Sequence, residues 1–470
     1  MKQFIILGGF IISLVFPRRD CLKQTETDAL GRSTRPEKET FAISDSGHFY
    51  IHYDTTGNAA PDLTDNNRNG IPDYIDEVGM IADSAYHVLV NIMHFSAPPV
   101  DEDSLYDIYI KSYSPGSYGE NFIDSPSQNT NGATSYMKID NNYSGFNSIF
   151  DLTPLQIMQI SVGHEYFHGI QWGYRKNKSG NEYFYEMTSM WFEDILIPNG
   201  NDYLDGWADP LLNNPTADFD NTGGGYELAL FGHYLSSFVD ENGQTDEKNS
   251  SIMLKIWENF KSNSTSPSAF ITIQNLLEIQ YNISFTEAWV DFMTRNLYNG
   301  IYKDMDNDFY YYSDQALIDP IQTNTPRLND SIRFELDLDN KSVAIQSYSM
   351  GDLNTIVEIK HVPDDYIGRV ATVSKESNIN AMFLSRDTLS QELYPNDEIH
   401  FIYGIDQLSS TMFIDAIPHT VPIPPSRLTA TAAQDSILLN WNPSPGPGDN
   451  LKYIIYRDGD SIFQTIDTNY

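Results

Sequence analysis

The chain has 470 residues, 40% hydrophobic and 13% aromatic, which is enough apolar side chain to fill more than one core. Its 28 basic residues are outnumbered by 65 acidic ones, leaving a net charge of −37 at neutral pH. Such an acidic surface repels nucleic acid and anionic lipid and attracts cations. We therefore expect neither nucleic acid nor an anionic membrane as a partner.

The N-terminus has the pattern of a signal peptide, which we assign to residues 1–21. Lys2 gives a basic start, and residues 4–16 form a short apolar run. Because a membrane-spanning helix needs about 20 apolar residues, we expect a secreted chain with no membrane span. Cys21 is the only cysteine, so no disulfide can form within the chain. Residues 22–40 are polar, and we expect them to be loose or to act as a removable pro-segment.

Residues 65–76 have the spacing of an EF-hand-type calcium loop. Oxygen-bearing side chains occupy loop positions 1, 3, 5, 9 and 12, and Gly70 at position 6 allows the sharp turn. The run resembles the D-x-N-x-N-G-x-P-D repeats of extracellular calcium proteins, although position 12 is Asp rather than Glu. The alternative is a turn rich in Asn and Asp that caps a helix at 74–95. The predicted structural Ca²⁺ site has the ligands Asp65, Asn67, Asn69, Ile71, Asp73 and Asp76.

Three strand-like runs precede a long apolar helix; they lie at 49–53, 106–110 and 134–139. The sequence Thr153-Pro154-Leu155-Gln156 predicts the start of the helix. Thr would be the N-cap, Pro would take the first helical position, and Gln would complete a capping box. No further proline interrupts the run to about Trp172, and its apolar residues predict a buried helix.

This helix carries the sequence His164-Glu165-Tyr166-Phe167-His168. Imidazoles four positions apart lie on one helix face, about 5–6 Å apart at Cβ. Catalytic zinc sites use three protein ligands and leave one position to water. We therefore predict His164 and His168 as zinc ligands and Glu165 as the general base. The alternative, two core histidines bonded to backbone carbonyls, is disfavoured because a buried helix rarely holds so many polar groups without a use.

A second helix is predicted at 181–197, where Glu186 and Glu193 share one face. Together the two helices resemble the gluzincin metallopeptidases, in which a Glu on the helix after H-E-x-x-H completes the zinc site. The match is similar to a family of secreted bacterial metalloproteases with H-E-[FY]-F-H-[AG]-x-Q and E-[AG]-x-A-x-W-x-E. The resemblance implies that Glu186 is the third ligand, with Glu193 as a supporting residue and the runner-up ligand. Met187 and Ser189 depart from the small apolar residues usual in that family.

A Gly-rich stretch at 223–234 runs into a further helix. Related metallopeptidases use a Tyr or His beyond the third ligand to hold the oxyanion. By that resemblance Tyr226 or His233 would donate this hydrogen bond. The alternative for either residue is ordinary packing in a core.

The resemblance implies an α+β zincin-like catalytic domain at 41–325, with helices expected at 224–239, 250–261, 267–278 and 284–298. Seven short β-rich runs at 330–419 predict an all-β sandwich, and 420–427 reads as a stiff linker. Residues 428–470 resemble the opening strands of a fibronectin type III module. Such a module needs about 90–100 residues, so we expect only part of one here.

We therefore expect a secreted zinc-dependent endopeptidase that acts on protein or peptide substrates. One alternative is a catalytically inactive member of the same fold that binds protein or glycan. Another is an aminopeptidase, which is less favoured because the chain has no Gly-x-Met-Glu-Asn signature and no obvious acidic anchor for a free amine.

Overall fold

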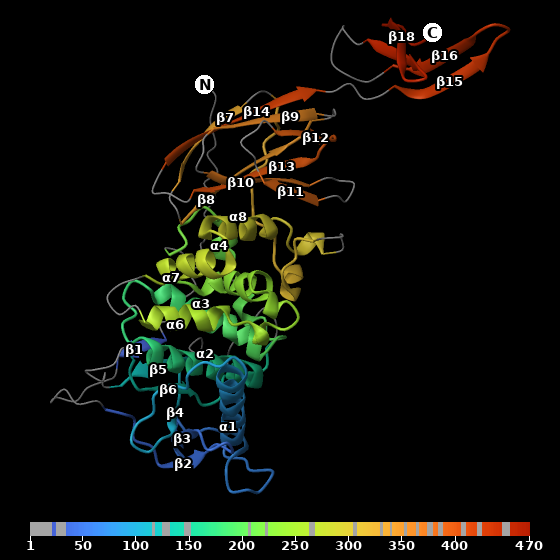
Figure 1. Cartoon of the computed structure of the whole chain (residues 1–470). Coiled ribbons are helices and arrows are strands. Elements are labelled where there is room, and N and C mark those ends of the chain that lie inside the picture. Colours follow the sequence, from blue (N-terminus) through green and yellow to red (C-terminus); the bar gives the residue numbers. More distant parts are fainter. Residues whose placement is uncertain are drawn as a thin grey trace, which may run out of the picture. The chain divides into compact units, whose positions relative to one another are not determined.

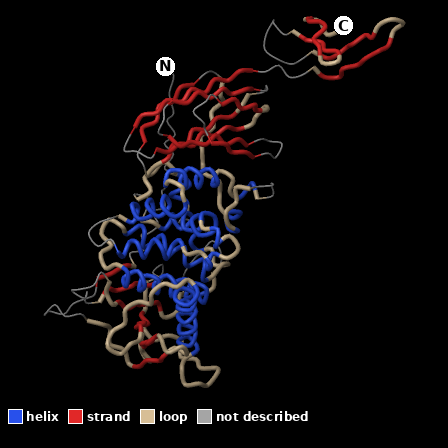
Figure 2. Tube along the Cα trace, in the orientation of Figure 1, coloured by secondary structure: helices blue, strands red, loops and turns tan. Residues whose placement is uncertain are grey.

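The computed structural model describes residues 21–24, 34–114, 118–124, 132–144, 152–204, 208–220, 224–262, 268–303, 308–329, 332–338, 341–351, 355–362, 366–373, 379–383, 389–405, 410–420, 425–443 and 452–470. The chain divides into two compact units. One comprises Met1–Lys178 with Phe192–Asp202, and the other comprises Ser179–Trp191 with Tyr203–Tyr470. Helix α3 (Glu182–Leu196) belongs to both, because the division falls inside it. Figure 2 shows strands and helices in both units.

The first unit contains a six-stranded mixed sheet with the order β1-β5-β6-β4-β3-β2. Strands β3, β4 and β6 run parallel, β2 and β5 are antiparallel to their neighbours β3 and β6, and β1 is parallel to β5. The predicted strands are confirmed as β3, β4 and β6, whereas β1, β2 and β5 were not predicted. The strands span Leu22–Gln24 (β1), Thr40–Ile43 (β2), Phe49–Tyr53 (β3), Tyr106–Lys111 (β4), Gly119–Ile123 (β5) and Ser135–Asp140 (β6).

Helix α2 (Pro154–Tyr174) packs against α1 (Asp73–Tyr86) and against β5 and β6 (Figure 1). Its predicted start is confirmed: Thr153 is the N-cap and forms a capping box with Gln156, and Pro154 is the first helical residue. The helix is buried on nearly every side, as its apolar composition predicts. The expected helix at 74–95 is α1, continued by a π-helical stretch at His87–Ile92.

The second unit contains the remaining helices. The expected helical segments are confirmed, although several of them end in π-helical turns. Aromatic rings fill their core, with Phe231 in edge-to-face contact with Phe219, Phe285 and Trp289 at centroid distances of 5.1–6.0 Å. The helices span Asp209–Asn213 (α4), Ala229–Tyr234 (α5), Ile252–Ser262 (α6), Ala269–Leu276 (α7) and Phe285–Asn296 (α8).

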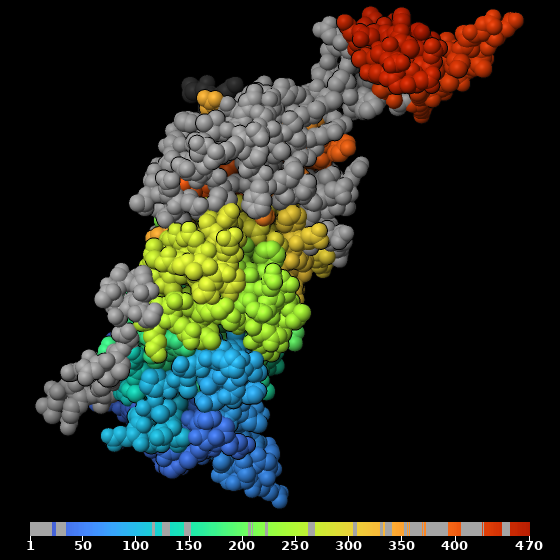
Figure 3. All heavy atoms as spheres, in the orientation of Figure 1, coloured from blue at the N-terminus to red at the C-terminus, as the bar shows by residue number. Residues whose placement is uncertain are grey.

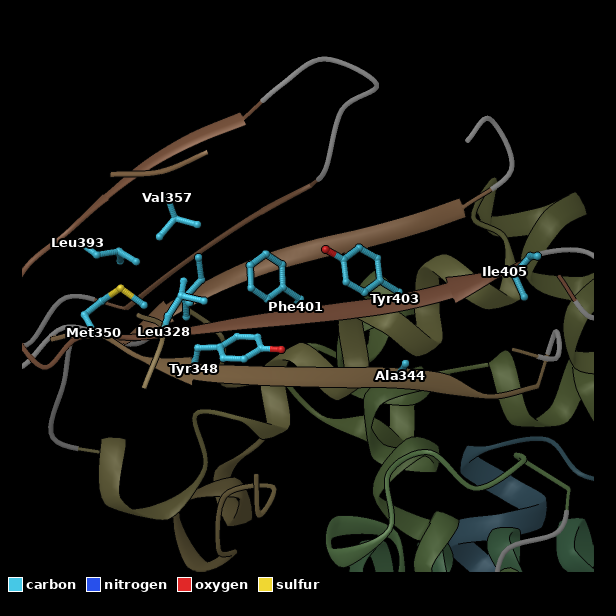
Figure 4. Close-up of a cluster of buried hydrophobic side chains, with 10 residues drawn as sticks. Leu328, Ala344, Tyr348, Met350, Val357, Leu393, Phe401, Tyr403 and Ile405 are labelled. Atoms are coloured by element: carbon cyan, nitrogen blue, oxygen red, sulfur yellow. The ribbon is translucent and has the colours of Figure 1, made fainter. Parts of the chain in front are cut away.

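Two four-stranded antiparallel sheets follow in the same unit, with the orders β11-β10-β13-β8 and β12-β9-β14-β7. Val357 and Leu393 of one sheet share a buried cluster with Tyr348, Phe401 and Tyr403 of the other, so the two sheets form the expected sandwich (Figure 4). The sequence predicted seven of its eight strands and missed β12. The strands span Ile332–Leu338 (β7), Val343–Ser349 (β8), Thr355–Val362 (β9), Tyr366–Val373 (β10), Ile379–Phe383 (β11), Leu389–Leu393 (β12), Glu398–Ile405 (β13) and Ser410–Thr420 (β14).

The C-terminal residues form two two-stranded sheets. Strand β15 (Ser426–Ala432) pairs with β16 (Ile437–Asn442), and β17 (Tyr453–Arg457) pairs with β18 (Asp460–Thr465). The Trp441 ring packs against Tyr453 at 5.2 Å. The fibronectin type III resemblance stays a prediction, and most of the linker predicted before these strands lies outside the described residues.

Candidate metal centre

Helix α2 presents His164 and His168 one turn apart, with ring centroids 4.5 Å apart. The two side chains are 3% and 0% exposed. Each ring is held through its Nδ1 atom. His164 Nδ1 lies 2.7 Å from Glu193 Oε1, and His168 Nδ1 lies 2.7 Å from Gln171 Oε1.

The carboxylate oxygen of Glu193 can only accept, so the Nδ1 atom of His164 donates to it. The Nδ1 atom of His168 donates in the same way to the amide oxygen of Gln171. Metal-bound histidines in proteins typically donate their other ring N–H to such a partner. The arrangement is therefore one that suits histidines binding a metal through Nε2.

Helix α3 supplies a carboxylate. Glu186 lies two turns before Glu193 on the same face of this helix. The helix therefore sets the position of Glu186 relative to Glu193, which contacts His164. Ligand atoms of Cys21, His164, His168 and Glu186 all lie within 4.8 Å of one another. Glu193 is not in this group. The assignment of Glu186 as the third ligand stays a prediction.

Cys21 is a member that the sequence did not predict. Its Sγ atom lies 3.5 Å from His164 Nε2. Sulfur and nitrogen ligands at the usual distances from one tetrahedral zinc ion are about 3.6 Å apart, so this pair fits a shared ion. The distance also fits a hydrogen bond between thiol and imidazole. Nitrogen, sulfur and carboxylate donors suit zinc, although other first-row metals accept the same set.

Glu165 lies beside this group but is not one of its four donors. It is 1% exposed, and its side chain lies against the backbone of Gly119, the first residue of β5. A Cβ atom at Gly119 would lie 2.7 Å from Glu165 Cγ. Burial, and then the carboxylate of Glu120, raise the pKa of Tyr113, and the charge of Glu165 adds to this shift. The Tyr113 side chain therefore remains a neutral phenol near Glu165.

Gly163 and Gly169 of α2 leave room for the side chains of Leu196 and Tyr106 to pack closely against the helix. A Cβ at Gly163 would lie 2.6 Å from Leu196 Cδ2, and one at Gly169 would lie 2.5 Å from the Tyr106 hydroxyl. Helix α2 is also tied to β5, since Asn121 Nδ2 donates to the Glu165 carbonyl at 2.6 Å. These contacts fix the height and rotation of the helix that carries both histidines.

Tyr226 and His233, predicted to hold the oxyanion, lie in the second unit. Tyr226 is 2% exposed and begins the short helix that follows Gly225. His233 is fully buried, with Nδ1 3.0 Å from both carboxylate oxygens of Glu247 and its ring stacked on Tyr312 at 4.8 Å. These contacts account for the burial of His233, and neither residue is in the four-donor group. Their catalytic role stays a prediction.

The predicted calcium loop lies at the surface before α1 (blue in Figures 1 and 3). Asp65 accepts hydrogen bonds from the backbone of Arg68 and Gly70, and Gly70 has the expected positive φ of 89°. Asn67 and Asn69 both donate to Asp76 Oδ2 at 2.9 Å. Four of the proposed ligand residues, Asn67, Asn69, Ile71 and Asp76, help to line a pocket of about 140 Å³.

The loop's three carboxylates, Asp65, Asp73 and Asp76, do not gather within 4.8 Å of one another in the described structure. Asp73 instead accepts hydrogen bonds from the backbone and side chain of Asn66. The geometry is therefore that of a turn closed by its own side chains, and Ca²⁺ binding stays a prediction.

A second acidic group, not predicted, joins Asp101, Asp103 and Asp107. Arg35 forms ion pairs with Asp101, with Asp107 and with Asp124. Two of the three carboxylates, Asp101 and Asp107, already have a cation, so their grouping has an explanation that needs no metal. Arg35 lies in the segment expected to be loose or removable, and it anchors that segment to β4.

Comparison with protein-family models gives no match, and no curated protein matches the chain. Among the described residues, none of the helices combines the length and apolar character that a membrane crossing needs.

Proposed function

We propose that the protein is a secreted zinc-dependent endopeptidase with a zincin-like catalytic domain. The observation that carries the proposal is the pair of imidazoles fixed through Nδ1, with Glu186 beside them. His164, His168 and Glu186 would hold the ion. Zinc bound there supplies a Lewis acid that polarises a peptide carbonyl and makes water acidic near neutral pH.

Glu165 has the general-base role. Its carboxylate would take the proton of the attacking water and pass it to the leaving amine. Packing against Gly119 restricts the rotamers open to this side chain and so supports a fixed position for the proton transfer. The carboxylate of Glu193 would stabilise the imidazole orientation of His164.

An extended peptide substrate suits the neighbouring sheet. Strand β5 starts beside Glu165, with one edge paired to β6 and the other to β1. A substrate strand that replaced β1 would pass next to the general base. Tyr226 or His233 would be the hydrogen-bond donor to the oxyanion.

The test is the substitution Glu165→Gln, which removes the base and keeps the shape. In chains freed of the N-terminal segment through β1, we expect proteolysis of an unfolded protein to fall about 10²–10⁴-fold while zinc content stays unchanged. Glu182→Gln, the same change at an exposed site on α3, is the matched control and should leave both unchanged.

One observation favours a rival function. Four buried donors form a closed set, and closed sets of four are typical of structural zinc. In that case the protein would be the catalytically inactive binding member of the fold. Proteolysis that persists in Glu165→Gln, or is absent from every form of the chain, would support this rival.

A further inference from the structure

The only thiol of the chain lies in the candidate metal group. Cys21 is 3% exposed, and its Sγ atom lies within 4.8 Å of ligand atoms of both histidines and of Glu186. A catalytic zinc site needs one position free of protein ligands. A zinc ion bound by Cys21 and the other three donors would have a fourth protein ligand in place of water.

Cys21 directly precedes a short strand that holds it near the metal group. Residues Leu22–Gln24 form β1, which pairs in parallel with β5 so that Leu22 lies opposite Asn121. The backbone N–H of Asn121 donates to the Cys21 carbonyl at 2.7 Å. Lys178 Nζ donates to the Leu22 carbonyl at 2.9 Å. Main-chain pairing thus holds Cys21, and Lys178 holds the residue that follows it.

The same strand covers the edge that a substrate would use. β5 pairs with β6 on one side and with β1 on the other, so it has no free edge in this structure. β5 also carries Gly119, which touches Glu165. The N-terminal segment therefore fills both the ligand position and the peptide-binding edge next to the general base.

We propose that Cys21 is an inhibitory fourth zinc ligand that keeps the unprocessed chain latent. On binding zinc the thiol would release its proton to solvent, and the thiolate would take the position that water needs. Cleavage beyond Gln24 would release Cys21 together with β1, and the departing thiolate would take up a proton from solvent. This inference rests on the proposed peptidase function. It also requires the signal peptide, predicted as residues 1–21, to end before Cys21.

The test uses the full unprocessed chain with cobalt(II) in place of zinc. A thiolate bound to cobalt(II) gives a charge-transfer band in the near ultraviolet. We expect this band in the native chain and in Gln24→Ser, a control on the exposed end of the same strand. Cys21→Ser should lose the band and keep the visible absorption of bound cobalt. It should also cleave an unfolded protein without processing, whereas the native chain should not.

Thiol labelling tests the same inference without a variant. Cys21 is the only cysteine, so one equivalent of label reports on it alone. We expect the zinc-loaded native chain to resist labelling and the chelated chain to react. Equal protection with and without zinc would mean that burial alone shields the thiol, and would overturn the inference.

Other outcomes separate the two proposals. A cobalt-loaded native chain without the band, native activity equal to that of Cys21→Ser, or a signal-peptidase cut after Cys21 would overturn the inhibitory role alone. Proteolysis by Cys21→Ser that disappears in Cys21→Ser/Glu165→Gln would support the peptidase. A band in the native chain with no proteolysis by any variant would overturn the peptidase and the inhibition together.

Discussion

His164 Nδ1 lies 2.7 Å from Glu193 Oε1, and both side chains are buried, at 3% and 2% exposure. A carboxylate in this position makes the imidazole a better electron donor at Nε2 and prevents the ring from rotating. The contact joins the two helices of the site, because His164 belongs to α2 and Glu193 to α3. It is therefore a contact on which both ligand geometry and helix packing depend.

Glu193→Gln should weaken zinc binding about 10–100-fold, because the neutral amide is a poorer partner for the imidazole N–H. Competition with a chromophoric chelator measures this affinity. Glu182→Gln, an exposed position of the same helix, should keep the native affinity. If both variants bind zinc as the native chain does, the His164–Glu193 contact has no part in metal binding.

Gly119→Ala should reduce proteolysis without releasing zinc. The new Cβ would lie 2.7 Å from Glu165 Cγ and 3.1 Å from the Lys138 carbonyl, so the glutamate must move. The measurement is the activity of zinc-loaded chains freed of their N-terminal segment. In Gly79→Ala, on α1, the nearest contact is a looser 3.3 Å, and activity should be native. Full activity in Gly119→Ala would show that the position of Glu165 does not matter.

Calcium should raise the unfolding temperature if the loop before α1 binds it. A ligand at one hundred times its dissociation constant stabilises the folded state by about 2.7 kcal/mol. Thermal unfolding of the zinc-loaded chain, with Ca²⁺ or with Mg²⁺, measures this effect. Asp76→Ala should abolish the response, whereas Asp62→Asn, just before the loop, should keep it. Superimposable native curves with and without Ca²⁺ would leave the loop as a hydrogen-bonded turn.

Stability of the sandwich should fall in mild acid because of His400. Burial lowers its pKa from 6.5 to about 4, and its Nδ1 lies 2.8 Å from the Ser347 hydroxyl. Between these two values the unfolded chain binds a proton that the folded chain does not. The free energy of unfolding of the sandwich is therefore highest above pH 6.5 and falls progressively toward pH 4, by up to about 3 kcal/mol.

Calorimetric unfolding at pH 7 and at pH 4.5 checks this prediction. His400→Gln should flatten the pH dependence of the sandwich transition, whereas His87→Gln, at an exposed position, should not. The same pH dependence in His400→Gln as in the native chain would assign it to other groups.

The local parts of the fold were predictable from the sequence. The start of α2 follows from Thr153 and Gln156, which are close enough to form a capping box by themselves. The shared face of His164 and His168 follows from the helical period alone. Short β-rich runs separated by turn residues likewise predicted seven of the eight sandwich strands.

The parts that depend on distant contacts were not predictable. Cys21 and His164 are far apart in the chain, and only the pairing of β1 with β5 brings them together. β1 has three residues and β5 is Gly-Glu-Asn-Phe-Ile, so neither shows the alternation that predicts a strand. The sole cysteine of a chain with a zinc motif was the one available signal.

Zinc K-edge X-ray absorption of the purified, unprocessed chain tests the metal centre most directly. The predicted spectrum contains imidazole scattering from two histidines, with nitrogen and oxygen ligands at about 2.0–2.2 Å and one sulfur at about 2.3 Å. A shell of light atoms without sulfur would keep the metal site and remove Cys21 from it. A chain without zinc, or a zinc shell without imidazole scattering, would contradict the central claim.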